Sequence, residues 1–346
     1  MQDDVLGTKP VKKRVGITPL VGCAGAFLIA LVFGFFGLLL GTVVGGLGGS
    51  SSESSLREVL LDGEAAAEKK IAAIPIKGLI MESMGSGPGS VSQVKKTLKA
   101  LEKDESVVGV LLVIDTPGGG VTASDRIYHD LSEFKKESKL PIHSIFLDVA
   151  ASGGYYVAMA SDHITAHPTT VTGSIGVISQ FFNFSDAMDK VGVSVNVVKS
   201  LNSQGEVSFK DIGSPYRPMR PEERALLQGL ITEMWDKFTQ VVADGRKGKL
   251  SPEQVKKLAD GRVFTGEQAL KEKLVDSVGY MEDAFAKIRE ASGHEKAKIV
   301  SYQKEPGLAE LLGLSAMIQE PGEARMAREL LAIRGGFHYL WTAGGY

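Results

Sequence analysis

The sequence predicts an α/β fold in which helices cover a parallel sheet. Two apolar, β-branched runs, residues 107–114 and 142–147, have the composition of strands that are buried on both faces. Each run leads into a glycine-containing turn and then into a segment with helical spacing. Strands that alternate with helices in this way form βαβ units, so we expect one sheet of mostly parallel strands.

The remaining elements follow from the same patterns. Strands are expected at residues 71–76, 79–81, 107–114, 142–147, 163–166, 176–180 and 193–198. Helices are expected at residues 91–102, 124–136, 155–161 and 221–243, and after the N-capping residues Ser251 and Thr265. Residues 56–70 have a helix-prone composition and are expected to form a short stalk.

Composition excludes several classes of protein. The chain has 346 residues and a net charge of -2, which argues against a nucleic-acid binder because phosphate contacts need a basic surface. Cys23 is the single cysteine, so an internal disulfide and a cysteine-based zinc site are both excluded. We expect neither a metal nor a cofactor.

The N-terminal segment predicts membrane attachment. Residues 15–52 contain no charge, and the apolar run 20–47 is long enough to cross a bilayer as a helix. Basic residues just before it place the N-terminus in the cytoplasm and the remainder of the chain outside. A cleaved signal peptide is the alternative. Cys23 lies in a lipoprotein-like box, but this box stands at the start of the apolar run and does not end it, which favours an ordinary membrane residue.

These observations divide the chain into five parts. We expect a cytoplasmic basic segment at 1–19, a transmembrane anchor at 20–47, and a linker and stalk at 48–70. The globular domain is expected at 71–300, and residues 301–346 form a leucine-rich tail with an aromatic end.

Ser152 is the first residue with a chemical prediction. It lies between small residues where a strand ends and a helix begins, so its hydroxyl would be exposed at the sheet edge beside free backbone N–H groups. A serine here also commonly serves only as a helix cap.

The glycine turn 117–120 ends the neighbouring strand on the same edge, where parallel sheets bind ligands. Two such turns, one of them with a serine, favour an acyl-transfer site.

A nucleophilic serine needs a general base. None of the six histidines lies in an obvious context for this role, although His163 and His167 are not excluded. A lysine can act as the base if burial lowers its normal pKa of about 10.4. Lys210 follows the run of strands after Ser152, and Asp211 beside it would oppose that shift if the two side chains lie close together.

Five motifs in order resemble the signal peptide peptidase A family. They are residues 117–120 (PGGG), 151–156 (ASGGYY), 172–177 (TGSIGV), 210–215 (KDIGSP) and 260–266 (DGRVFTG), spread over about 71–288. The resemblance implies a ClpP/crotonase-like fold of repeated β-β-α units.

The resemblance also implies the roles of individual residues. Ser152 is then the nucleophile, Lys210 the base and Ser174 the residue that orients the lysine, while Gly119 and Gly153 form the oxyanion hole. Lys199 is a rival for the base, because the loop 201–208 is longer than the usual connection in the family.

The biology implied by the resemblance is a membrane serine endopeptidase. Its substrates would be remnant signal peptides and other extended hydrophobic peptides. It would assemble as a homo-oligomer, an octamer-like ring or dome in which adjacent subunits supply the Ser and the Lys of one active site. The tail is expected to act as a self-inhibitor. Two alternatives stay open, namely a crotonase-type acyl-CoA enzyme and a non-catalytic membrane scaffold on the same fold.

Overall fold

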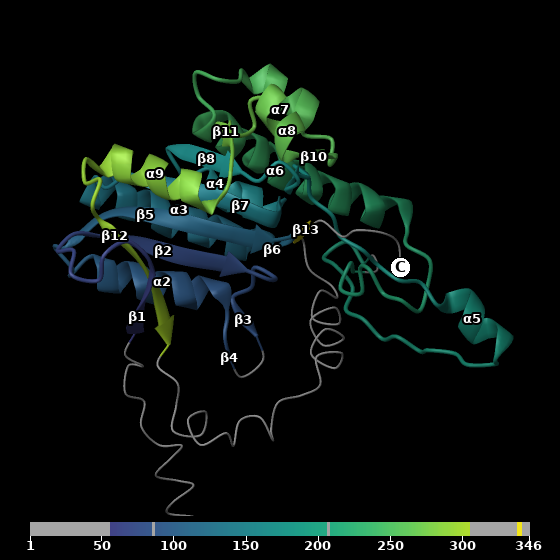
Figure 1. The fold of residues 1–346 in the computed structure, drawn as a ribbon. Coiled ribbons are helices and arrows are strands. Elements are labelled where there is room, and N and C mark those ends of the chain that lie inside the picture. The colour runs from purple at the N-terminus through teal and green to yellow at the C-terminus, as the bar shows by residue number, and fades with distance from the viewer. Residues whose placement is uncertain (1–55, 85–86, 206–207, 305–337, 341–346) are drawn as a thin grey trace, which may run out of the picture. The chain divides into compact units, whose positions relative to one another are not determined.

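The computed structural model describes residues 56–84, 87–205, 208–304 and 338–340 (Figure 1). Its strands are β1 (Leu56–Asp62), β2 (Lys70–Lys77), β3 (Ser83–Met84), β4 (Gly87–Pro88), β5 (Val107–Thr116), β6 (Gly118–Gly120), β7 (Ile142–Ala151), β8 (His163–Ala166), β9 (Val171–Gly173), β10 (Val263–Thr265), β11 (Ser277–Val278), β12 (Lys298–Lys304) and β13 (His338–Leu340). Its helices are α2 (Ser90–Leu101), α3 (Val121–Ser138), α4 (Gly153–Ala158), α5 (Ser185–Lys190), α6 (Pro221–Gly245), α7 (Pro252–Leu258), α8 (Gly266–Lys271) and α9 (Met281–Ser292).

One large sheet organises the fold. Its strand order is β1-β12-β2-β5-β7-β8-β11, with β9 branching from β7 and β10 pairing with β9. The pairs from β12 through β2, β5, β7 and β8 to β11 are parallel, whereas β1 and β10 pair antiparallel with their neighbours. This arrangement confirms the predicted α/β class.

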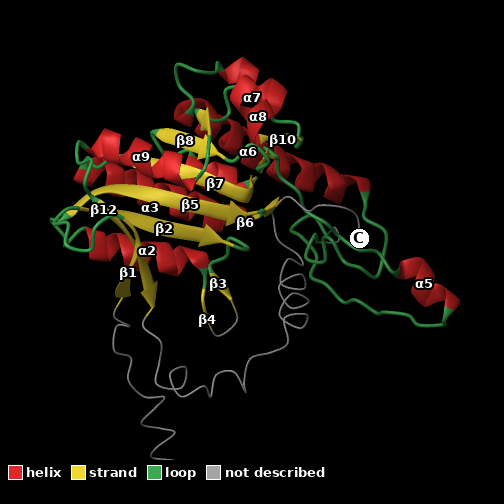
Figure 2. Ribbon diagram, in the orientation of Figure 1, coloured by secondary structure: helices red, strands yellow, loops and turns green. Residues whose placement is uncertain are grey.

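Helices pack on both faces of the sheet (Figure 2). The alternation of side chains along a strand sends Ala72 and Ile74 of β2 into a core with α2, α3, α4 and α6. Ile71 and Ala73 point to the opposite face, where Phe285 of α9 covers them. A strand in the middle of this sheet is therefore buried on both faces. For this reason the sequences of β5 and β7 are nearly continuous apolar runs.

The predicted stalk helix at 56–70 is wrong. Residues 56–62 form β1, which pairs antiparallel with β12 at the edge of the sheet. Local helix propensity is a weak preference, and the unpaired edge of β12 offers a full row of backbone hydrogen bonds instead. The sheet thus begins at Leu56 and continues to Lys304, beyond both ends of the domain predicted at 71–300.

Three of the predicted strands differ in the structure. Residues 79–81 and 176–180 contribute only isolated bridges, through Ile80 and Ile178 respectively. Residues 193–198 carry alternating valines but belong to no strand in the described part of the chain. They lie in a segment from 181 to 220, here called the arm, which projects from the sheet and carries α5 near its far end (Figure 1).

The predicted anchor at 20–47 lies outside the described residues. Among the helices that the structure does describe, none is long and apolar enough to cross a membrane. The N-caps behaved as expected, since the hydroxyls of Ser251 and Thr265 each accept the N–H of a glutamine three residues on.

Candidate active site

Ser152 occupies the junction between β7 and α4, at the carboxyl edge of the parallel strands. Its φ of +53° lies in a region that side chains rarely adopt, and such backbone strain collects at functional turns. The residue is 1% exposed, and its Oγ has no hydrogen-bond partner among the described residues. A buried hydroxyl without a partner calls for an explanation, and a role in catalysis is one explanation. No side-chain capping bond is made by Ser152.

Backbone contacts fix this strained turn. Ala151 pairs with Gly173 across β7 and β9, and the Ser152 N–H donates to the Gly173 carbonyl at 2.8 Å. Ser174 directly follows β9, is buried, and has a φ of +49°. Its N–H donates to the Arg262 carbonyl at 2.8 Å. The two predicted serines therefore follow directly after paired residues of neighbouring strands.

Gly119 and Gly153 bring two backbone segments together. A Cβ on Gly153 would lie 2.4 Å from Ser124 Oγ and 3.2 Å from the Gly119 nitrogen, while one on Gly119 would lie 2.1 Å from the Ile80 carbonyl oxygen. Neither site has room for a side chain. Gly153 is also the first residue of α4, where N–H groups lack partners within the helix. The two predicted oxyanion donors thus lie on adjacent backbone segments beside Ser152.

A peptide segment of the chain itself lies along this edge. Strand β13 pairs antiparallel with β6, with Tyr339 opposite Gly119. On its other side, His338 exchanges two backbone hydrogen bonds with Ile178, at 3.0 and 3.1 Å. An extended peptide can therefore be held by backbone pairing on both sides. The sequence showed no strand signal at 338–340, because the glycine-rich surroundings hide it.

The two lysines have different surroundings. The Lys199 ammonium lies 2.5 Å from the Asp211 carboxylate, which Arg217 also contacts through two nitrogens at 2.9 Å. These bonds from Arg217 and Lys199 hold the pKa of Asp211 well below its usual range. Lys210 is exposed. Since Ser152 Oγ has no partner among the described residues, neither lysine is within hydrogen-bonding distance of it in a single chain.

Sequence reasoning missed Arg217. It bridges Asp211 to the buried Glu223 at the start of α6, and its hydrogen bonds lower the pKa of Glu223 to about 2, against the effect of burial. Asp211 therefore binds Lys199 and Arg217, and the ion pairs of the described residues include none between Asp211 and Lys210.

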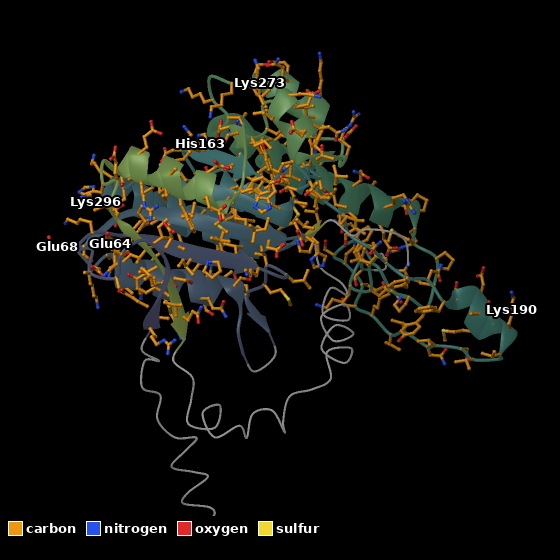
Figure 3. The ribbon with its side chains drawn as sticks, in the orientation of Figure 1. Glu64, Glu68, His163, Lys190, Lys273 and Lys296 are labelled. Carbon is orange, nitrogen blue, oxygen red and sulfur yellow. The ribbon has the colours of Figure 1, made fainter. Side chains whose placement is uncertain are left out.

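Two of the histidines lie at the wrong end of the sheet. His163 (labelled in Figure 3) is the first residue of β8 and lies opposite His143, the second residue of β7. Ser152 instead follows the carboxyl end of β7. Burial lowers the pKa of His143 to about 4 and also lowers the pKa of His163. This placement excludes both as a base for Ser152.

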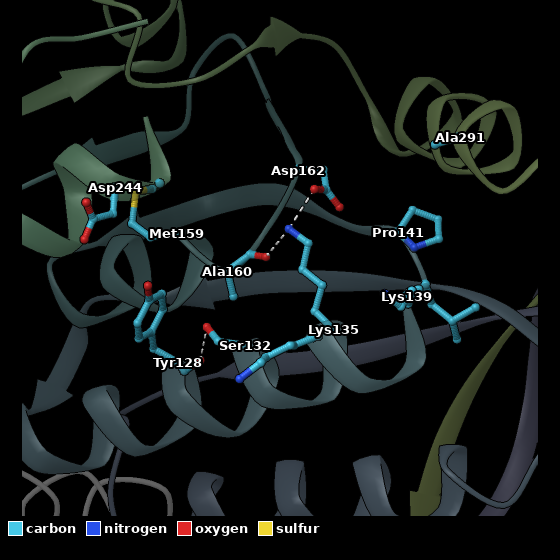
Figure 4. A pocket seen from close by; sticks show the side chains of 13 residues that line it. Tyr128, Ser132, Lys135, Lys139, Pro141, Met159, Ala160, Asp162, Asp244 and Ala291 are labelled. Atoms are coloured by element: carbon cyan, nitrogen blue, oxygen red, sulfur yellow. Dashed lines mark hydrogen bonds and ion pairs between the residues drawn. The ribbon is translucent and has the colours of Figure 1, made fainter. Parts of the chain in front are cut away.

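A surface pocket of about 760 Å³ lies away from the predicted site residues (Figure 4). It is bordered by α3, the end of α4 and the end of α6. Inside it, the Lys135 ammonium is already bound to Asp162 at 2.7 Å and to the Ala160 carbonyl at 3.0 Å. Within the described residues, no group of three or more acidic, histidine or cysteine side chains could hold a metal ion.

Comparison with known proteins identifies the family of this site. The model of peptidase family S49 matches residues 134–295, and that of the Clp protease family matches residues 79–171. The chain is 36% identical over 247 residues to an Enterococcus faecium protein assigned as a signal peptide peptidase, SppA, covering 70% of this chain and 69% of the relative. The chain belongs to peptidase family S49. It is a serine protease with a Clp protease-like α/β fold.

Other S49 relatives differ in length. A protease of Synechocystis is 42% identical over 216 residues, covering 62% of this chain and 72% of the relative. Protease 4 of Salmonella typhi is 30% identical over 270 residues, covering 76% of this chain but only 42% of that protein. The S49 match contains Ser152, Ser174 and Lys210, whereas Gly119 falls within the Clp protease match.

Proposed function

We propose that this S49 peptidase is an endopeptidase that hydrolyses remnant signal peptides and other extended hydrophobic peptides. The observation that carries the proposal is β13, an extended segment held between β6 and Ile178 at the edge that bears Ser152. Recognition through backbone hydrogen bonds suits substrates of variable sequence, provided that they are unfolded. The names of relatives such as the Enterococcus faecium protein support signal peptides as substrates.

The proposed mechanism uses a Ser/Lys dyad. Neutral Lys210 removes the proton of Ser152 as the Oγ attacks the peptide carbonyl. The N–H groups of Gly119 and Gly153 stabilise the oxyanion, and Ser174 orients the lysine amine. The protonated lysine then donates to the leaving amine, and the same lysine activates the water that releases the acyl group.

Lys210 is favoured over Lys199 on electrostatic grounds. A general base must be free of its proton, and an ion pair with a carboxylate favours the protonated ammonium. Lys199 has such a pair with Asp211 at 2.5 Å, whereas Lys210 lies exposed on the arm. Contact with an apolar surface would remove the Lys210 ammonium from water and favour the neutral amine.

A homo-oligomer supplies that contact in the proposal. The arm exposes many large apolar side chains: Phe181, Phe182, Phe184, Val191, Val193, Val195, Val197, Val198, Leu201, Phe209 and Tyr216. An apolar surface of this kind marks an interaction site. Lys210 of the partner subunit would then complete the site at Ser152 in a ring or dome of identical chains, octamer-like in size.

The proposed location follows from the sequence before the domain. The uncharged run at 20–47, preceded by basic residues, anchors the chain in the cell membrane with its N-terminus in the cytoplasm. The peptidase domain would then lie outside the cytoplasm, next to the bilayer that holds its substrates. Residues 1–19 and 48–55 flank this anchor as the basic segment and the linker.

The C-terminal tail is proposed to inhibit the enzyme from within. Residues 338–340 occupy backbone positions that an extended substrate would use, next to Gly119. Substrate and tail would compete for the same hydrogen bonds. Because β12 runs to Lys304, the tail begins after that residue and not at 301.

Hydrolysis of a hydrophobic signal-sequence peptide by detergent-solubilised protein tests the mechanism. We expect Ser152→Ala and Lys210→Ala each to lose activity by about 10³-fold or more, because dyad members act as a unit. Lys199→Ala is the matched control and should retain activity. Activity that persists in Lys210→Ala contradicts the assignment of the base, and activity that persists in Ser152→Ala contradicts the mechanism altogether.

A further inference from the structure

Thr116, the last residue of β5, connects several parts of the site edge. It is fully buried, and its Oγ1 donates to the Gly78 carbonyl at 2.5 Å while accepting the Gly118 N–H at 3.0 Å. Gly118 begins β6 with a φ of +104°, a conformation that the turn after Pro117 requires. The hydroxyl of Thr116 therefore fixes the point at which β6 leaves β5.

The methyl group of the same side chain faces the helix after Ser152. A Cβ on Gly154 would lie 2.6 Å from Thr116 Cγ2 and 3.3 Å from the Thr116 carbonyl oxygen. The first turn of α4 thus rests directly on Thr116. One side chain touches both glycine segments, through Oγ1 on the β6 side and through Cγ2 on the α4 side.

Each of these contacts is one residue away from a proposed oxyanion donor. Gly118 precedes Gly119, and Gly154 follows Gly153. We propose that Thr116 is a positioning residue that sets the spacing between these two donors and thereby the fit of the oxyanion hole to the transition state. This inference rests on the proposed function. A displacement of one donor by a fraction of an ångström is enough to weaken stabilisation of a tetrahedral intermediate.

Two variants separate the hydroxyl from the methyl group. Thr116→Val keeps the branched shape but removes the hydrogen bonds to Gly78 and Gly118, and Thr116→Ser keeps the hydroxyl. For a fluorogenic peptide we expect Thr116→Val to lower kcat by about 30-fold or more with KM within about twofold, since the hole acts mainly on the transition state. Thr116→Ser removes the methyl contact with Gly154 but keeps both hydrogen bonds that fix β6, so its kcat should stay within about threefold of wild type.

Thr170→Val provides the matched control. Thr170 is also fully buried and its Oγ1 donates to backbone carbonyls of β7, at 3.0 Å to Phe146, but it contacts neither glycine segment in the described contacts. Its loss should reduce stability and leave kcat unchanged. A second readout is the affinity for a peptide aldehyde, whose adduct with Ser152 places an oxyanion in the hole. We expect this affinity to fall in Thr116→Val, while that for the matching peptide alcohol stays constant.

The outcomes are distinct. A kcat for Thr116→Val within about twofold of wild type overturns the inference, as does an equal loss in Thr116→Ser or Thr170→Val. If Thr116→Val does not fold, Thr116→Cys takes its place, because a thiol accepts the Gly118 N–H only weakly. Its kcat should fall at least about fivefold below that of Thr116→Ser, and equality overturns the inference. Failure of the proposed function would appear differently, as wild-type protein that does not hydrolyse the peptide.

Discussion

The edge that bears Ser152 and the arm differ in what fixes their conformation. At the edge, Ser152 is 1% exposed, its strained turn is held by a backbone bond to Gly173, and the glycine segments pack with no space left. In the arm, Val193, Val195 and Val197 are each about half exposed although they alternate as in a strand. Contacts within the chain fix the edge. The apolar side chains of the arm, in contrast, stay exposed in the described structure.

The two residues of the proposed dyad therefore differ in their surroundings: Ser152 is buried at the sheet edge, whereas Lys210 is exposed on the arm. The sheet holds Ser152, Gly119 and Gly153 in place, and the proposed roles of nucleophile and oxyanion donors require such preorganisation. The proposed base lies where only another surface can exclude water. A peptidase built in this way would be inactive as separate chains and active once assembled.

The largest expected effect comes from separating an intact Ser152 and an intact Lys210 onto different chains. Ser152→Ala and Lys210→Ala homo-oligomers should each be about 10³-fold less active than wild type. Equal mixing after dissociation and reassembly should restore about a quarter of wild-type activity per site, because that share of composite sites receives both intact residues.

Peptide hydrolysis measured before and after reassembly checks this expectation. Mixed oligomers that form but remain inactive would show that the base does not come from the neighbouring chain. Mixing either variant with Lys199→Ala chains controls for the reassembly step itself, because Lys199 is bound to Asp211 and half of the sites should be active both before and after exchange.

A second prediction concerns the arm itself. Val195→Asp places a charge in the proposed interface and should weaken assembly by about 100-fold or more, since an unpaired buried charge is strongly unfavourable. Leu60→Asp on β1 is the matched control, because Leu60 and Val195 are 44% and 45% exposed. Analytical ultracentrifugation of the detergent-solubilised protein measures the effect. If both variants dissociate equally, or neither does, the arm is not the interface.

The sequence predicted the edge better than the arm, for a physical reason. The runs at 107–114 and 142–147 and the turns after them are local patterns, and parallel pairing then brings the ends of β5 and β7 to one edge. Ser152 and Gly119 could be placed from these rules and from the resemblance to the family. The valines at 193–198 have strand periodicity, but a strand also needs a partner, and periodicity does not say where that partner lies.

Other errors have the same origin. Residues 56–62 read as helical because propensity is counted one residue at a time, whereas the open edge of β12 decides their conformation. The pairing of Asp211 with Lys199 and Arg217 depends on how the loop folds back, which no spacing rule contains. The sequence places Asp211 next to Lys210 and gives no sign that its carboxylate binds Lys199 and Arg217.

A third prediction concerns the stability of the domain that carries the sheet, through the buried ion pair of Arg246 and Asp276. Asp276 accepts two bonds from Arg246, whose side chain is 2% exposed, and a third from Lys249. Burial alone would raise the pKa of Asp276, but these cations lower it to about 2. Asp276→Asn should cost about 3 kcal/mol of unfolding free energy at pH 7, because the Arg246 charge stays buried without its partner.

The pH dependence follows from the sign of the shift. A carboxylate whose folded pKa lies below its ordinary value of 3.8 stabilises the fold above pH 3.8, and this contribution is lost as pH falls toward 2. Denaturant titrations should therefore show wild type and Asp276→Asn converging over that interval. Asp260→Asn is the control: the bonds of Arg262 also lower the pKa of Asp260 to about 2, but this pair is exposed and should leave the midpoint unchanged. Equal effects of both variants would contradict the role of burial.

The smallest expected effect concerns the tail, where the edge is occupied by the chain itself. His338→Pro removes the N–H that donates to Ile178 at 3.0 Å, whereas His338→Ala leaves the backbone intact. If backbone pairing makes the tail a competitor of substrate, the proline variant should raise kcat/KM by about threefold to tenfold, and truncation after Lys304 should do at least as much. The alanine variant should stay near wild type.

Equal activation by both substitutions would mean that the His338 side chain, and not the strand, holds the tail in place. No activation by truncation would show that substrate reaches Ser152 without displacing β13, so the pairing with Gly119 would not mark the path of the substrate backbone.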